Sequence, residues 1–332
     1  MIKVEDLSKK YGTFEAVKGV SFSVGQDQVL GFLGPNGAGK TTIMKILTGY
    51  HFPSRGNVSI DGVSLEENPV EIKKRIGYLP ENNPLYGDLS PDEYLNFIAQ
   101  VRLIPKEERQ KALDSAITAC GLEAVRNQRI DSLSKGYRQR VGLAQAIIHD
   151  PYILILDEPT SGLDPNQIIE IRALIRELGK RKIVILSTHI LQEVEAVCSQ
   201  VLILNEGRIA AQGTPSEIAA TIRSASENLD TWELYLKGAV DIKKEINISD
   251  REIGNVEITE EENGIKKLEF VIRNSESYVN DGELIFDWAV KSGYKIIGMQ
   301  RKKLSLEDIF VKLTSEQPSE SSEPSNGGSQ NE

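Results

Sequence analysis

The chain has 332 residues, of which 39% are hydrophobic, enough to bury one large core and a second, smaller one. Its net charge is -10, and the acidity lies mostly in residues 221–332, with 22 acidic against 14 basic side chains, whereas residues 1–220 carry 27 and 25. A chain without a basic surplus has no broad attraction for nucleic-acid phosphates, so we expect no nucleic acid among its partners.

No apolar run approaches the roughly 18 to 20 residues that a membrane-spanning helix needs. The longer runs, at 152–156 and 183–186, have the length of strands. The first residues carry charges at Lys3, Glu5 and Asp6 with no apolar stretch behind them, unlike a secretory signal peptide. We therefore expect a cytoplasmic protein that meets a membrane only through a partner.

Up to about residue 220, short β-branched runs alternate with longer segments of helical period. This pattern predicts an α/β domain with a largely parallel sheet. Buried strands are expected at 29–33, 153–156, 183–187 and 201–205.

The segment GPNGAGKT lies between the first of these strands and a helical pattern. It fits the phosphate-binding motif G-x-x-x-x-G-K-T in the strand–loop–helix context that the motif needs. Its glycines let backbone N–H groups wrap closely around phosphates, and the helix N-terminus adds positive potential. Lys40 is expected to reach the β- and γ-phosphates and Thr41 to offer a hydroxyl to Mg²⁺. The residues assigned to nucleotide binding are Gly34, Pro35, Asn36, Gly37, Ala38, Gly39, Lys40, Thr41 and Thr42.

Residues 91–148 have an almost wholly helical pattern. Ser90 and Pro91 are suited to begin the first helix, as its cap and its first residue. We interpret residues of about 88–148 as a helical subdomain inserted into the α/β domain.

The apolar strand ILILDEP follows this helical region and ends in two carboxylates. Asp157 suits a water-mediated contact to Mg²⁺, and Glu158 is placed to polarise an attacking water. Acidic residues often end strands as helix caps, so the pair alone is weak support. Together with the phosphate loop, it predicts nucleotide hydrolysis.

Apolar content falls over residues 222–231, and a domain boundary there makes 1–221 the first domain. Beyond it, the strand-like segments WELYLKG, KKLEFVIRN and KIIGMQRKKLS, with a helix closed by Gly293, predict a small α+β domain at 231–314. Residues 315–332 have no large apolar side chain and are expected to form a disordered acidic tail.

Several reactive residues stand outside any motif. Cys120 and Cys198 lack motif spacing and are expected to be packing thiols. His51 and His149 are expected to have structural roles. The basic run at 73–75 is interpreted as a solvated face, with contact to a partner or to anionic lipid headgroups as the alternative.

Three further short segments belong with the phosphate loop and the acidic strand end. LSKGYRQR precedes the acidic strand end by 20 residues, PTSGLDP follows Glu158, and STH ends a later strand. With the phosphate loop, and in this order, they resemble ATP-binding-cassette (ABC) ATPases over residues 1 to about 220. The resemblance implies that Tyr11 stacks on adenine, with core packing as the alternative. It also implies that 133–137 form the signature motif, that 161–164 contact the other subunit of a dimer, and that His189 contacts the γ-phosphate.

In this family two subunits enclose ATP between the phosphate loop of one and the signature motif of the other. The resemblance therefore implies a homodimer in which Ser134 and Gly136 approach the γ-phosphate held by a second copy. It implies an ATPase that uses ATP and Mg²⁺, with Glu158 as general base and with His189 and Lys40 as the other catalytic residues.

The sequence departs from the family pattern in two places. The signature is LSKGY where LSGGQ is usual, so Lys135 and Tyr137 replace Gly and Gln. In IGYLPENNPLY, Glu81 stands where the family has a glutamine that meets Mg²⁺. A carboxylate can also ligate Mg²⁺, which makes Glu81 a metal ligand beside Thr41 and Asp157, with Asn82 as the substitute.

A single cassette with a small C-terminal domain ending in SLEDIFVKLT resembles the ATPase subunits of bacterial ABC-2 exporters. The opening IKVEDLSKKYG and the PENNPLY segment resemble the subgroup that includes the gliding-motility ATPase. These resemblances imply ATP-driven closure of a dimer that moves an integral membrane permease, encoded on a separate chain and bound near residues 81–100. The C-terminal domain is expected to stabilise the dimer or to regulate it.

Two other functions remain open from the sequence. A cassette ATPase that acts on ribosomes, DNA repair or a protein complex usually has two cassettes or a long coiled-coil insertion, and neither is visible here. A regulatory module that senses ATP without useful hydrolysis fits the altered signature, but the intact Asp157, Glu158 and His189 argue against it.

Overall fold

The computed structural model describes residues 1–218, 230–237, 248, 252–261, 265–273 and 278–302. Most of the predicted boundary at 222–231 and the whole of the predicted tail at 315–332 therefore lie outside the described residues. None of the described helices is both long and apolar enough to cross a bilayer.

A six-stranded sheet, in the order β10-β9-β3-β8-β7-β6, is the centre of the N-terminal part. Every neighbouring pair is parallel except β10 with β9. The continuous apolar runs of β3, β7 and β8 are buried along their whole length because helices or a second sheet cover both faces. The four predicted strands are confirmed to within one residue at each end. The strands are β3 (Val29–Leu33), β6 (Ile76–Leu79), β7 (Ile153–Asp157), β8 (Ile183–Thr188), β9 (Gln200–Asn205) and β10 (Arg208–Gly213).

A second, antiparallel sheet in the order β2-β1-β4-β5 was not expected from the sequence. Its inner face shares one hydrophobic core with helix α1 and one face of the central sheet. Phe22 and Phe32, from the two sheets, meet edge to face with ring centroids 5.2 Å apart. The elements are β1 (Ile2–Tyr11), β2 (Phe14–Val24), α1 (Lys40–Leu47), β4 (Arg55–Ile60) and β5 (Val63–Ser64).

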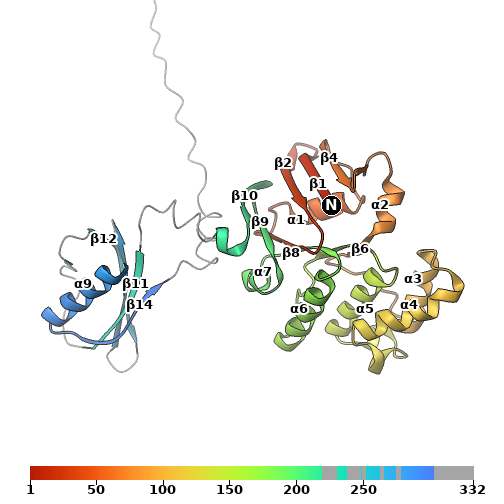
Figure 1. Cartoon of the computed structure of the whole chain (residues 1–332). Helices are drawn as coiled ribbons and strands as arrows, with labels where there is room; N and C mark the ends of the chain where they lie inside the picture. The colour runs from red at the N-terminus through yellow and green to blue at the C-terminus, as the bar shows by residue number, and fades with distance from the viewer. Residues whose placement is uncertain (219–229, 238–247, 249–251, 262–264, 274–277, 303–332) are drawn as a thin grey trace, which may run out of the picture.

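The predicted helical region contains three α-helices that lie side by side, α3, α4 and α5 (Figure 1), and two short 3-10 helices at Glu123–Val125 and Ile130–Ser132. Helix α3 begins as predicted: Ser90 and Glu93 form a capping box, and Pro91 is the first helical residue. A second core joins these helices to the other face of the central sheet, together with α6 and α7. The bounds are α2 (Pro69–Arg75), α3 (Pro91–Val101), α4 (Lys106–Ala119), α5 (Lys135–Ile147), α6 (Pro165–Gly179) and α7 (Leu191–Val197).

The C-terminal part contains an antiparallel sheet in the order β12-β13-β11-β14 with helix α9 against one face (Figure 1). Trp232, Leu234 and Phe270 are fully buried between the sheet and the helix. Gly293 follows α9 with a φ of +79°, as the predicted helix end requires. Strand β12 was not foreseen. The bounds are β11 (Asp230–Lys237), β12 (Glu252–Glu261), β13 (Ile265–Arg273), α9 (Tyr278–Lys291) and β14 (Lys295–Lys302).

The isolated cysteines and His149 have packing roles, as the sequence suggested. Both thiols are free and buried, and burial raises the pKa of Cys120 and of Cys198 to about 12. The Nε2 atom of His149 lies 3.2 Å from the carbonyl oxygen of Ile76, and burial lowers the pKa of this imidazole to about 4. These groups are inert at neutral pH.

The contact of β6 with α5 depends on Gly77. A Cβ atom at this position would lie 2.0 Å from the carbonyl oxygen of Ala146 in α5. Gly77→Ala must therefore push α5 away from the sheet, and we expect the unfolding free energy to fall by about 1 to 3 kcal/mol in urea denaturation. Gly25→Ala is the matched control, since its Cβ would meet only the Gln28 side chain, at 3.4 Å. Equal stability of the two variants would contradict this account.

Candidate active site

A pocket of 540 Å³ lies where the phosphate loop, the β1–β2 hairpin and the loops after β6, β7 and β8 meet. Ligand sites typically enclose about 300 to 1,000 Å³. A larger hollow of 910 Å³ between α4, α5 and α6 contains none of the predicted site residues, so volume alone does not locate the site. The pocket is lined by Tyr11, Phe14, Ala16, Asn36, Gly37, Gly39, Lys40, Thr41, Thr42, Glu81, Glu158, Ser161 and His189.

The phosphate loop connects β3 to α1 in a conformation that requires glycine. Gly37 and Gly39 have φ angles of +85° and +102°, and a Cβ at Gly39 would lie 2.7 Å from the carbonyl oxygen of Ala16. Lys40, the first residue of α1, is buried, and its ammonium donates to the carbonyl oxygens of Gly34 (2.7 Å) and Pro35 (3.2 Å). The loop thus encloses a cation beside its own backbone N–H groups.

The charge of Lys40 is balanced by nearby carboxylates. Burial lowers the pKa of the Lys40 ammonium, and the negative charges of Glu158, Asp157 and Glu81 oppose this effect. The nearest is Glu158, whose Oε1 lies 3.8 Å from Nζ. These three carboxylates come from the ends of β7 and β6, next to the loop after β3.

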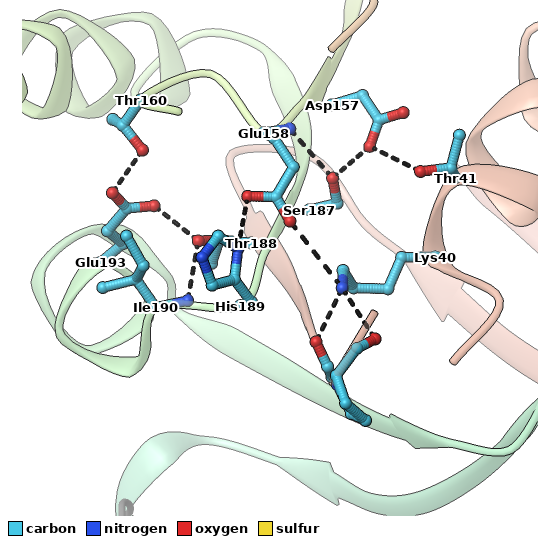
Figure 2. Close-up of polar contacts among 12 residues, drawn as sticks. Lys40, Thr41, Asp157, Glu158, Thr160, Ser187, Thr188, His189, Ile190 and Glu193 are labelled. Atoms are coloured by element: carbon cyan, nitrogen blue, oxygen red, sulfur yellow. Dashed lines mark hydrogen bonds and ion pairs between the residues drawn. The ribbon is translucent and has the colours of Figure 1, made fainter. Parts of the chain in front are cut away.

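Asp157 ends β7 between the phosphate loop and β8. Its Oδ1 accepts hydrogen bonds from the hydroxyls of Ser187 and, at 3.4 Å, Thr41 (Figure 2). Burial raises the pKa of this carboxyl, and both hydroxyl donors oppose the rise. Its other oxygen, Oδ2, is buried and has no hydrogen-bond partner among the described residues.

These groups fit Mg²⁺. The described residues contain no cluster of three or more His, Cys, Asp or Glu side chains able to hold a metal ion. Mg²⁺ does not need one, because it is usually held by one or two carboxylates together with phosphate oxygens and water. The unsatisfied Oδ2 of Asp157 beside the Thr41 hydroxyl supplies such ligands. Glu81 lines the same pocket, whereas its proposed substitute Asn82 does not.

Glu158 is held at the centre of the site by both backbone and side chain. It adopts a φ of +48°, a conformation that costs a residue other than glycine about 1 to 3 kcal/mol, and its N–H donates to the Ser187 hydroxyl at 3.1 Å. Its Oε2 lies 2.9 Å from Nδ1 of His189 (Figure 2). Burial raises the pKa of the Glu158 carboxyl, and His189 and Lys40 oppose the rise. A carboxylate with a raised pKa is suited to accept a proton near neutral pH.

Ser134 and Gly136 lie outside this pocket, at the start of α5. Ser134 is exposed and caps the helix, accepting a 3.4 Å hydrogen bond from the N–H of Tyr137. Gly136 is buried against Gln167 of α6, where a Cβ would come within 2.4 Å. Lys135, the unusual signature residue, is exposed and has its ammonium beside Gly162. One chain therefore does not unite the signature with the phosphate loop.

The pocket also includes residues that were missed in the sequence. Phe14 pairs with Tyr11 across the β1–β2 turn, and 64% of its surface is exposed. Tyr11 is 42% exposed, so the alternative of core packing is wrong for this residue. Its ring instead meets His51 edge to face, with centroids 5.8 Å apart. Two aromatic residues on either side of a two-residue turn were the clue to an exposed aromatic pair.

The ABC transporter family pattern matches residues 17–161. A Bacillus subtilis ABC transporter ATP-binding protein, YxlF, is 32% identical over 94% of this chain and 99% of its own length. The chain belongs to the ABC transporter family. The bacitracin transport ATP-binding protein BcrA of Bacillus licheniformis is 33% identical, over 94% of this chain and 97% of its own.

Solved structures of ABC proteins agree with this family assignment. An ATP-binding subunit of an ABC transporter shares 32% identity and a TM-score of 0.61, over 67% of this chain and 93% of its own. A dimeric cassette in a post-hydrolysis state with ADP and Pi shares 25% identity and a TM-score of 0.59, over 64% of this chain and 98% of its own. The predictions of a phosphate-loop fold, ATP binding and ATPase activity are thus confirmed. The resemblance to gliding-motility ATPases stays a prediction.

In this ABC ATPase, the pH dependence of turnover should report on the pair of Glu158 and His189. A general base must be ionised, so activity is present above the pKa of Glu158 and is lost as the pH falls through it. His189 holds that pKa down. His189→Ala should therefore lower kcat and move its acid limb to higher pH, measured as ATPase rate from about pH 5 to 9. His51→Ala should leave the acid limb in place, and an unmoved limb in His189→Ala would contradict the pairing.

Proposed function

We propose that two copies of this chain enclose two ATP molecules and that hydrolysis drives a membrane permease encoded on a separate chain. The observation that supports this most is the division of the site: the phosphate loop, Glu158 and His189 share one pocket, whereas Ser134 and Gly136 lie outside it, at the start of α5. A second copy that presents its α5 N-terminus to the pocket completes the site. The dimeric form of a similar cassette supports this arrangement.

In the proposed mechanism, the backbone N–H groups of the phosphate loop and the ammonium of Lys40 hold the β- and γ-phosphates. Glu158 accepts a proton from the attacking water, and His189 orients that carboxylate beside the γ-phosphate. The hydroxyl of Ser134 from the second copy donates to the γ-phosphate. Bound Mg²⁺, held by Thr41, Asp157 and Glu81, would offset the negative charge of the phosphates. The exposed ring of Tyr11 stacks on the adenine.

The catalytic role of Glu158 has a direct test. Glu158→Gln keeps the size of the side chain but removes the base, so we expect ATP binding to persist while turnover falls by at least about 100-fold. Nucleotide binding and phosphate release measure the two effects. Sedimentation with ATP should show a dimer of Glu158→Gln, because ATP that is not hydrolysed keeps the subunits closed. ATPase activity at the wild-type rate would remove Glu158 from this role.

The permease is proposed to dock at a groove of 700 Å³ between α2 and the α3–α4 connection. Apolar side chains line it, among them Val101 and Leu103, the latter 79% exposed. Arg102 also lines the groove. Burial lowers the pKa of its guanidinium. Among the described residues, no carboxylate lies within ion-pair distance of this guanidinium. The groove also contains Glu108 and Asp150 beside its basic side chains, and Arg102 fits an acidic residue on an amphipathic cytoplasmic segment of the permease. The exposed rings of Tyr86 and Phe97, 5.7 Å apart, belong to the predicted contact region at 81–100.

Disruption of this groove should separate transport from hydrolysis. Leu103→Glu places a charge on an exposed apolar contact and should abolish co-purification of the tagged protein with a polytopic membrane protein from native membranes. The isolated protein should keep its ATPase rate, because the groove shares no residue with the nucleotide pocket. Lys111→Glu is the control, because Lys111 is an exposed residue of α4 that does not line the groove. Recovery of ribosomal or DNA-repair proteins in place of a membrane protein would favour the soluble ATPase.

The remaining parts of the proposal follow from the relatives. One is named as a bacitracin transport protein and another as a probable multidrug ABC transporter protein, which supports an exporter here. We place the chain in the cytoplasm, bound to the inner face of the membrane through its permease. The division into a cassette at 1–221 and a domain at 231–314 that stabilises or regulates the dimer is part of the same proposal.

A further inference from the structure

A buried carboxylate joins the two loops that carry Glu158 and His189. Glu193, in α7, is only 3% exposed. Its Oε1 accepts a hydrogen bond from the hydroxyl of Thr160, and its Oε2 accepts one of 2.7 Å from the hydroxyl of Thr188 (Figure 2). Thr160 lies two residues after Glu158, and Thr188 directly precedes His189. One side chain thus fastens the loop after β7 to the end of β8.

The Thr188 hydroxyl also fixes the turn at His189. While it donates to Glu193, it accepts a 3.0 Å hydrogen bond from the N–H of Ile190. His189 lies between the two ends of this interaction and is itself half exposed. Because half of the imidazole surface is open to solvent, the backbone on either side helps to set its 2.9 Å distance to Glu158. The chain of contacts therefore runs from Thr160 through Glu193 and Thr188 to His189.

The stability of the fold does not explain why a charged residue stands at position 193. Burial of a carboxylate is costly unless hydrogen bonds and an opposite charge offset it. Two hydroxyls provide hydrogen bonds, and Arg172 of α6 lies 3.8 Å from Oε1. The Nε of Arg172 is nevertheless buried without a hydrogen-bond partner among the described residues. Because well-packed apolar side chains often replace such buried pairs without loss of stability, the arrangement points to a positional role.

We propose that Glu193 is a positioning residue for ATP hydrolysis, which holds the loops of Glu158 and His189 at the spacing that general base catalysis needs. The inference rests on the proposed roles of those two residues and adds a third residue that touches neither nucleotide nor water. Glu193 lines no part of the nucleotide pocket. Its loss should therefore impair the chemical step while leaving ATP binding in place.

The sharpest variant is Glu193→Gln, which keeps the shape of the side chain. An amide has one acceptor oxygen, so only one of the two threonine hydroxyls retains its acceptor. Displacement of catalytic groups by about 1 Å costs on the order of 100-fold in rate. We expect kcat to fall about 10- to 100-fold, with KM for ATP within about threefold of wild type.

Two further readouts separate positioning from a general structural defect. The first is kcat per nucleotide-binding site, which falls in Glu193→Gln if the chemical step is impaired and stays at the wild-type value if the variant only loses folded protein. Glu193→Asp keeps both acceptor oxygens and should recover part of the lost rate. Glu195→Gln, at an exposed position of the same helix, is the matched control and should behave as wild type.

Thr188→Val and Thr160→Val provide a route that does not change a buried charge. Each removes one hydroxyl donor to Glu193 at nearly constant volume, and each should lower kcat more than it changes KM. The double variant should show less than the sum of the two effects, because both act through the same carboxylate. This double-mutant cycle of Thr160 and Thr188 tests the inference even if Glu193→Gln does not fold.

The outcomes are distinct. A fall in kcat per nucleotide-binding site with preserved KM and an unchanged Tm supports the inference. Wild-type kcat in Glu193→Gln, or a loss that only follows the unfolded fraction, overturns it. If this overturning result is obtained while wild-type protein hydrolyses ATP and Glu158→Gln does not, only the role of Glu193 is removed. If Glu158→Gln retains full turnover, the proposed function fails whatever Glu193 does.

Discussion

The parallel order of β3, β8 and β7 is the constraint on which the active site depends. Their carboxyl ends lie at one edge of the sheet, so the loops after them deliver the phosphate loop, His189 and Glu158 to the same place. The resulting contacts of Glu158 with Lys40 at 3.8 Å and with His189 at 2.9 Å join three segments that are far apart in the sequence. No local motif makes these contacts by itself.

This edge of the sheet is also where the fold departs from the most stable arrangement. Lys40, Asp157, Glu158 and Glu193 are charged side chains that are almost fully buried. Glu158 adds a backbone conformation that is unfavourable for its residue type. The surrounding strands are buried along their whole length, so their packing fixes the backbone and holds these groups in place. Burial raises the pKa of the Glu158 carboxyl, and Lys40 and His189 limit that rise, which keeps the group able to act as a base.

In the proposed function, the helical region serves the second copy and the membrane partner rather than the pocket of its own chain. Helix α5 packs on β6 through Gly77, while its N-terminus, with Ser134, lies outside the nucleotide pocket. The proposed docking groove lies between α2 and the connection from α3 to α4. Since α2 runs directly into β6 and β6 leads to Glu81 in the nucleotide pocket, one continuous segment connects the proposed permease contact to the nucleotide pocket.

Features fixed by local chemistry were predictable from the sequence. The four buried strands, the phosphate loop and the cap of α3 at Ser90 each depend on residues that are neighbours in the chain. The acidic strand end and the STH segment were likewise visible as candidates. Family resemblance supplied their roles, because the residue types alone allow helix caps and ordinary core histidines as well.

What the tertiary structure decided depends on long-range contacts. The antiparallel sheet and the exposed pair of Tyr11 and Phe14 arise from pairing of β1 with β2 and β4, where no single segment indicates its partner. Glu193 looked in sequence like an ordinary helix residue. Only folding brings it within hydrogen-bond distance of Thr160, 33 positions away. The sequence by itself determined the candidate groups, because motif spacing is local, and the fold determined which of them meet, because burial and strand order bring distant residues together.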